Sequence, residues 1–132
     1  MNYSQGLDER IDIIAFFNKM PGTLHLYDAV YQWIRSEFDD VIIRVQKTQI
    51  SFYNKHLFAC VSLPVRRKKS WPELCIILTF GLGHKLEHPR IAVATEPYPG
   101  RWTHHVLIQS PDEIDGQIKE WLREAYHFSM NK

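Results

Sequence analysis

The stretch QISFYNKHLFACVSLPV, residues 49–65, decides the fold of this chain. Apolar and polar side chains alternate over Gln49–Tyr53, which is the two-residue period of a strand with one buried face. Asn54-Lys55 is a short turn, and His56–Val65 returns as the partner strand. The stretch therefore predicts an antiparallel hairpin.

Further strand-like segments lie on both sides of this hairpin. Each is short, rich in β-branched or aromatic residues, and bounded by turn residues. These segments are Val41–Val45, Leu74–Leu82, Ile91–Thr95 and Trp102–Gln109. Because no helical pattern separates the strands, they predict an antiparallel or mixed sheet of about five to six strands.

Helical periodicity precedes the strands. Asp8 opens a first predicted helix, and Met20-Pro21-Gly22 ends it. Its apolar side is predicted to consist of Ile11, Ile14, Ala15 and Phe17. A second helix, capped by Thr23 or Gly22, carries an apolar stripe wide enough to pack against a sheet. That stripe consists of Leu24, Tyr27, Val30, Tyr31, Ile34 and Phe38. Residues 1–7 are predicted to be a loose tail.

The clearest helix signal lies near the end of the sequence. Ser110 supplies a hydroxyl at the N-cap, Pro111 takes the first helical position, and Glu113 follows three residues after the cap, so the three form a capping box. A helix is predicted over residues 111–127. Its apolar stripe consists of Ile114, Ile118, Trp121, Leu122 and Ala125. Residues 1–132 are thus predicted to form a single α+β domain, in which two N-terminal helices and one C-terminal helix pack mainly on one face of a curved antiparallel sheet.

Composition favours a compact intracellular domain. Hydrophobic residues make up 45% of the 132 residues, enough for a buried core, and 16 Lys and Arg nearly balance 15 Asp and Glu. That balance argues against general nucleic-acid binding through excess positive charge. Cys60 and Cys75 are interpreted as reduced core thiols, with a cross-strand pair left open. Because no signal-peptide pattern and no membrane-length apolar run is visible, a cytoplasmic location is expected.

The strand alternation also predicts a polar face. If the apolar residues of each strand face the helices, the intervening residues face away from them. These residues are Arg44, Gln46, Gln49, Ser51, Tyr53, Arg101, Thr103 and His105. They offer many hydrogen-bonding groups and lack the Lys and Glu mixture of an ordinary surface, although a solvated face remains the simpler interpretation. Arg44 and Arg101 are the residues that could hold a carboxylate or phosphate through two hydrogen bonds.

A basic cluster lies between two predicted strands. It consists of Arg66, Arg67, Lys68 and Lys69, with Trp71 close by. Basic side chains contact phosphates and an aromatic ring stacks on bases, so the cluster is a candidate nucleic-acid contact. The balanced total charge makes a solvated loop the alternative interpretation.

Two histidine patterns resemble catalytic motifs. His84, Glu87 and His88 match the H-x-x-E-H pattern of inverted zinc peptidases, but the segment runs from Gly83 into Pro89 and is predicted to be a loop, whereas the motif requires a helix. His104 and His105 are adjacent on a predicted strand and point to opposite faces. There is also no glycine-rich phosphate loop. No metal, no cofactor and no catalytic residue set is predicted.

Several segments together resemble a known family. They are Thr48–Phe52, Phe58–Val61, Arg101–Val106 and Ile118–Tyr126. These segments resemble the bacterial domain-of-unknown-function family numbered 5655, and the resemblance covers roughly residues 24–128. In outline the pattern is similar to YjbR/MmcQ-like folds, in which helices pack on a curved antiparallel sheet. The resemblance implies this architecture and, by analogy with proposals for some of those folds, DNA binding; it implies no activity.

Three functions are compatible with these patterns. The first is a non-enzymatic binding module whose polar face holds a small anionic ligand or a partner segment. The alternative is a nucleic-acid-associated protein that uses the basic cluster with Trp71. The third is an enzyme with His105 as a general base, for which the sequence identifies no orienting carboxylate.

Overall fold

The computed structural model describes residues 3–64 and 69–132. Two helices open the chain, α1 (Tyr3–Phe16) and α2 (Leu24–Glu37), separated by short 3-10 turns at Phe17–Lys19 and Pro21–Thr23. A third helix, α3 (Gly116–Met130), closes it after a 3-10 turn at Pro111–Glu113. The strands between them are β1 (Ile42–Val45), β2 (Ile50–Tyr53), β3 (Leu57–Ser62), β4 (Ile76–Leu82), β5 (Ile91–Tyr98) and β6 (Arg101–Ile108). None of the described helices is both long and apolar enough to cross a membrane.

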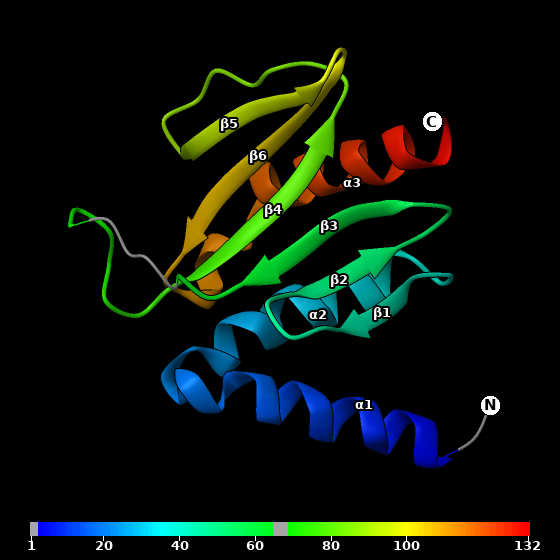
Figure 1. Cartoon of the computed structure of the whole chain (residues 1–132), viewed down its shortest axis with the longest axis vertical. Coiled ribbons are helices and arrows are strands. Elements are labelled where there is room, and N and C mark those ends of the chain that lie inside the picture. Colours follow the sequence, from blue (N-terminus) through cyan, green and yellow to red (C-terminus); the bar gives the residue numbers. More distant parts are fainter. Residues whose placement is uncertain (1–2, 65–68) are drawn as a thin grey trace.

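All six strands form one sheet in the order β1-β2-β3-β4-β6-β5, and every neighbouring pair is antiparallel (Figure 1). The predicted α+β class and antiparallel sheet are therefore confirmed. The predicted hairpin is β2 and β3. A second tight hairpin joins β5 to β6 through Pro99 and Gly100, and Gly100 has a φ of 75°, a backbone conformation that favours glycine.

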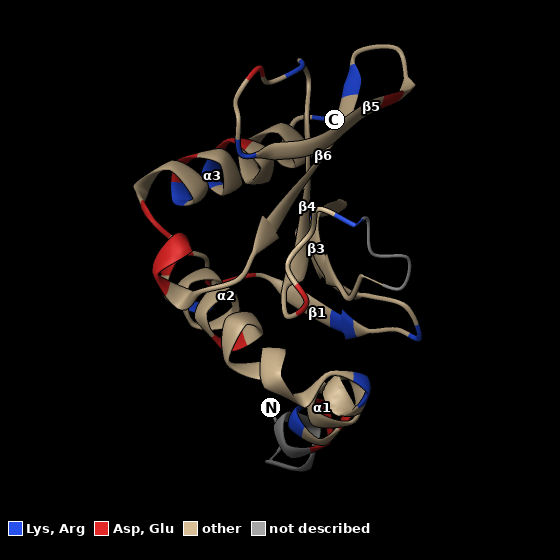
Figure 2. Cartoon of the chain, turned by 90° about the vertical axis from the view of Figure 1, so that its left-hand side faces the viewer, with Lys and Arg blue, Asp and Glu red and all other residues tan. Residues whose placement is uncertain are grey.

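Helices α2 and α3 cover the same side of the sheet (Figure 2). The Tyr27 ring of α2 stacks on Phe52 of β2 at 6.2 Å between ring centroids, and α3 packs against β3 and β4. The buried apolar residues form one continuous cluster that includes side chains from all three helices. The predicted set of two N-terminal helices and one C-terminal helix is thus confirmed, and α2 and α3 leave the other side of the sheet uncovered.

The N-terminal helix differs from the prediction in two ways. It begins at Tyr3, so the prediction of a loose tail over residues 1–7 is wrong for residues 3–7. The buried side chains in and just after it are Ile13 and Phe17, each 1% exposed, whereas Ile11 and Ile14 are about half exposed. Periodicity alone did not determine which of several isoleucines faces the core. The helix also extends further toward the N-terminus than predicted, because helix formation is cooperative and propagates from the buried turn at Ile13 into the polar residues before it.

The C-terminal helix has two start signals, and the prediction used the first. The Ser110–Glu113 capping box forms as predicted, but it caps only the 3-10 turn. The α-helix then begins at Gly116, where the Asp115 carboxylate accepts a hydrogen bond from the Ile118 amide. The helix spans 116–130 rather than 111–127. The 3-10 turn ends at Ile114, and Asp115 then serves as the N-cap of the α-helix.

The sheet opens into a fork between β3 and β4. These strands pair only from Ala59 opposite Phe80 to Ser62 opposite Ile77. On the Ala59–Phe80 side of this segment, the start of β3 stays with β2, past an irregularity in the register, while β4 continues along β6 with Gly81 opposite Thr103. Figure 1 shows the two strands diverging in front of the C-terminal half of α3. The fork is where the sheet leaves space.

Candidate functional site

The register aligns one row of the polar face across five strands. Arg44 pairs with Ser51, which lies opposite Cys60. Cys60 lies opposite Thr79, and Thr79 opposite His105. Opposite residues in an antiparallel sheet share a face, so three of the predicted site residues, Arg44, Ser51 and His105, lie in this row.

The β1–β2 end of this face is occupied by its own side chains. Ser51 is fully buried, although it faces away from the helices. Its hydroxyl donates to Gln46 Oε1 at 2.7 Å and accepts from Gln49 Nε2 at 2.8 Å. The Arg44 guanidinium lies 5.4 Å from the centre of the Tyr53 ring. These predicted site residues therefore contact one another.

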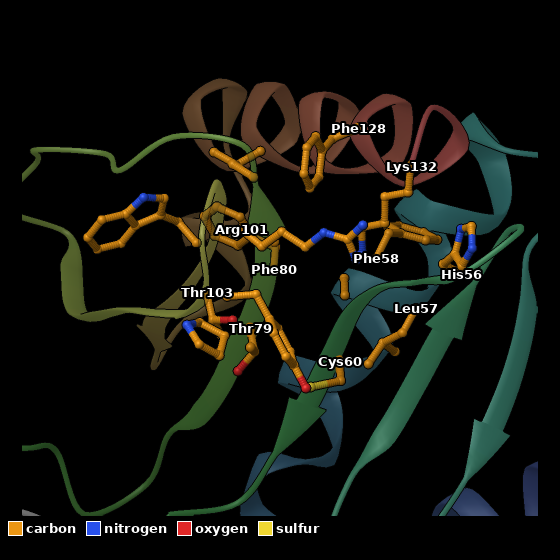
Figure 3. A pocket seen from close by; sticks show the side chains of 16 residues that line it. His56, Leu57, Phe58, Cys60, Thr79, Phe80, Arg101, Thr103, Phe128 and Lys132 are labelled. Atoms are coloured by element: carbon orange, nitrogen blue, oxygen red, sulfur yellow. The ribbon is translucent and has the colours of Figure 1, made fainter.

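The β4–β6 end contains a pocket of about 400 Å³ in the fork. Strands β3, β4 and β6, the end of β5 and the C-terminal end of α3 all contribute to its wall (Figure 3). Its polar side chains are His56, Cys60, Thr79, Tyr98, Arg101, Trp102, Thr103 and Lys132, and its other lining residues are apolar or glycine. Of the predicted site residues, Arg101 and Thr103 line the pocket directly.

Two cationic side chains converge on this pocket. The Arg101 guanidinium and the Lys132 amine lie beside each other at one side of it (Figure 3). Partial burial and the positive charge of Arg101 lower the pKa of Lys132, whose amine lies 5.5 Å from the centre of the Phe128 ring. Neither residue forms an ion pair with a carboxylate in the described ranges 3–64 and 69–132, and no Asp or Glu lines the pocket.

A family model described as "Domain of unknown function (DUF5655)" matches residues 15–129. The chain belongs to this family. The resemblance inferred from the segments between Thr48 and Tyr126 is therefore confirmed, whereas the likeness to YjbR/MmcQ-like folds stays a prediction. No curated protein and no solved structure matches the chain. The matched range includes every pocket residue except Lys132, but the family description assigns no function to any of them.

His105 lies in the polar row described above and hydrogen-bonds to a residue that lines the pocket. Its Nδ1 lies 2.8 Å from the Thr79 hydroxyl, which lines the pocket, and burial lowers the pKa of the imidazole. Within the part of the chain that the structure describes, no carboxylate contacts this ring. Among the described residues, the Thr79 hydroxyl rather than a carboxylate therefore orients this ring.

The other histidines of the sequence motifs have structural partners. His84 lies in the loop between β4 and β5, where its Nε2 is 2.5 Å from Glu124 of α3. His88 contacts the Trp121 ring edge-on, and His104 is fully buried, accepting a hydrogen bond from the Leu86 amide at 3.0 Å. The described residues contain no group of three or more His, Cys, Asp or Glu that could hold a metal ion.

The basic cluster falls largely outside the described residues. Arg66, Arg67 and Lys68 lie in the range 65–68, outside the described residues. Lys69 is exposed and Trp71 is half-buried. Nucleic-acid contact through this cluster therefore stays a prediction.

Sequence reasoning missed several pocket residues. Thr79 and Gly81 interrupt the apolar run of β4 at alternate positions, and that period was a usable sign of a face turned away from the core. His56, Phe128 and Lys132 carried no such sign, because β3 and α3 bring them to the fork only after folding. Both cysteines are buried, and neither forms a disulfide with the other. The cross-strand cysteine pair left open by the sequence is therefore not a disulfide.

Proposed function

We propose that this domain is a non-enzymatic binding module whose ligand is a small anion held in the fork pocket. One observation carries the proposal. Arg101 and Lys132 present two positive charges to one pocket, and none of its described lining residues is Asp or Glu. Adjacent like charges raise each other's free energy, and an anion between them would relieve that repulsion.

The surrounding groups suit such a ligand. A guanidinium donates two parallel hydrogen bonds to a carboxylate or phosphate, and the amine of Lys132 adds a charged donor. The hydroxyls of Thr79 and Thr103 lie across the pocket from the cations (Figure 3) and supply further polar contacts. We also infer a cytoplasmic location, which the reduced state of Cys60 and Cys75 supports because disulfides are rare in reducing compartments.

Titration followed by amide NMR tests this proposal. The wild-type protein is titrated with acetate, inorganic phosphate, benzoate and phenyl phosphate, each as a sodium salt at matched ionic strength. We expect at least one anion to shift the amides of residues 79–82 and 101–103 more than sodium chloride does. Chloride at matched ionic strength controls for general screening.

Two matched arginine variants locate the charge that matters. Arg101→Gln should weaken binding about tenfold or more, because a hydrogen bond to a charged group contributes about 1.5–3 kcal/mol. Arg44→Gln removes the same charge from the β1–β2 end of the same face and should leave binding nearly unchanged. The proposal fails if no anion shifts these amides, or if Arg44→Gln weakens binding as much as Arg101→Gln does.

A further inference from the structure

We propose that the bound anion is organic, with one anionic group and an apolar body about the size of an aryl ring lying on the sheet at Gly81. This inference rests on the proposed anion-binding function and narrows its ligand class. The shared chemistry is that of an aryl carboxylate or an aryl phosphate monoester. Three features of the pocket carry it.

The first feature is a glycine that neither the backbone nor the packing requires. Gly81 lies within β4, and among the described glycines only Gly100 has a positive φ. A Cβ at Gly81 would meet nothing closer than the Trp102 carbonyl oxygen at 3.8 Å, an ordinary contact. A strand-interior glycine costs roughly 0.5–1 kcal/mol relative to alanine and often marks close approach of a ligand. What Gly81 provides is open space on the pocket surface.

Gly83, two residues further on, shows the opposite case. A Cβ there would lie 3.0 Å from Cε1 of Phe128, so packing of that ring explains the glycine. The Phe128 ring forms part of the pocket wall (Figure 3). The two glycines thus have different roles. Gly83 leaves room for the Phe128 ring to pack against the strand, whereas Gly81 leaves open space in the pocket beside that ring.

The second feature is the apolar lining. Phe58 and Phe80 contribute to the wall although each residue is only 1% exposed, while Leu57 at the pocket remains 39% exposed and Tyr98 68% exposed. An apolar ligand body would remove part of this surface from water, and burial of apolar area is favourable in proportion to that area. A small hydrated ion would leave it exposed.

The third feature is size combined with the position of the charges. A volume of about 400 Å³ lies in the range of small-molecule sites and would hold on the order of ten water molecules. Arg101 and Lys132 bring their charges to one side of this space (Figure 3). An anionic group held there leaves room for the rest of a ligand toward Thr103 and its strand partner Gly81.

The test compares anions that share a head group. Benzoate should bind about tenfold or more tightly than acetate, and phenyl phosphate should exceed inorganic phosphate by a similar factor. Comparing the two aryl ligands distinguishes a carboxylate from a phosphate source. Benzamide, which has the ring without the charge, should bind more weakly than benzoate.

A cavity-filling variant tests the position of the ligand body. Gly81→Val places a β-branched side chain in the open space and should abolish the preference for the aryl ligands, while the protein's melting temperature stays equal or rises. Thr95→Val, on the exposed edge strand β5 and outside the pocket lining, is the matched control and should keep the preference.

The outcomes separate this inference from the function on which it rests. If acetate binds wild-type protein as tightly as benzoate, and inorganic phosphate as tightly as phenyl phosphate, the pocket is an anion site without an apolar subsite and the inference is overturned alone. Unchanged aryl affinity in folded Gly81→Val overturns the position of the ligand body. If no anion binds wild-type protein, both the inference and the proposed function fall. The wild-type ligand series remains decisive even if Gly81→Val does not fold.

Discussion

At the scale of one residue, the sequence pattern predicts correctly which face of the sheet Ser51 lies on but does not predict that its side chain is buried. Alternation along β2 places its side chain away from the helices, yet none of its surface reaches solvent. Gln46 and Gln49, from the connection between β1 and β2, fold over its hydroxyl and hydrogen-bond to it. The two-residue period predicts direction, whereas burial depends on which neighbouring side chains lie above. The candidate pocket consequently lies in the half of the face that these amides leave uncovered.

Two buried histidines predict a loss of stability in mild acid. Burial lowers the pKa of His104 below the ordinary 6.5, although the Phe80 backbone opposes this shift, and burial likewise lowers the pKa of His105. The unfolded chain therefore binds protons first as pH falls below about 6.5, so protonation favours unfolding. The free energy of unfolding should be constant above this pH and should decrease as pH falls toward the folded-state pKa values.

Urea unfolding at several pH values between about 7.5 and 5.5 measures this effect. The double variant His104→Gln/His105→Gln should show a smaller decrease over the same range, even if it is less stable at every pH. An equally steep decrease in the double variant would assign the effect to other groups. His104 also accepts the Leu86 amide hydrogen bond, so its protonation should release the loop before β5.

At the scale of one element, the start of α3 depends on a side chain with two partners. Asp115 caps the helix through the Ile118 amide, and its oxygens accept hydrogen bonds from Arg90 Nη1 at 2.9 and 3.0 Å. Desolvation opposes the charged form, but these hydrogen bonds prevail and lower the pKa of Asp115. Arg90 lies just before β5, so this contact also joins the β4–β5 loop to the helix.

Two substitutions of Asp115 distinguish how much the N-cap and the ion pair with Arg90 each contribute to the free energy of unfolding. Asp115→Ala should lower the free energy of unfolding by about 1 kcal/mol, the usual cost of losing an N-cap, plus the smaller contribution of a partly exposed ion pair. Asp115→Asn keeps an oxygen for the Ile118 amide and should cost less than the alanine variant. Chemical denaturation measures both, and equal losses would show that the cap contributes little.

At the scale of the whole molecule, one core joins the two halves of the forked sheet. Strands β3 and β4 share only a short paired segment, but α3 packs against both. Phe58 of β3 contacts Tyr126 of α3, and Phe80 of β4 stacks on Trp121 of the same helix. The helix thus spans the fork and contributes to the apolar core of both halves.

This shared helix predicts a single cooperative unfolding transition. Trp33 on α2 and Trp102 on β6 lie in different halves of the molecule, so tryptophan fluorescence reports on both of them. Fluorescence and far-UV circular dichroism should give coincident denaturation curves, as expected for a domain of this size. A separate early loss of fluorescence or of ellipticity would show that the halves unfold independently.

The sequence by itself determined the α+β class, the six strands, the helix-covered side of the sheet and the family. These follow from local signals, namely the two-residue and helical periods, turn residues and the Ser110 capping box, all of which act between near neighbours in the chain. The sequence also placed Arg101 and Thr103 on the open face.

Only the tertiary structure decided where a ligand could lie. The fork exists because β3 pairs with β4 only from Ala59 onward, while β4 continues along β6 past Phe80, and Lys132 reaches Arg101 from the far end of α3. Such contacts join residues far apart in sequence, and strand order and helix docking set them through packing rather than local propensity. For the same reason the open space at Gly81 becomes part of a pocket only when Phe128 and Leu57 stand around it.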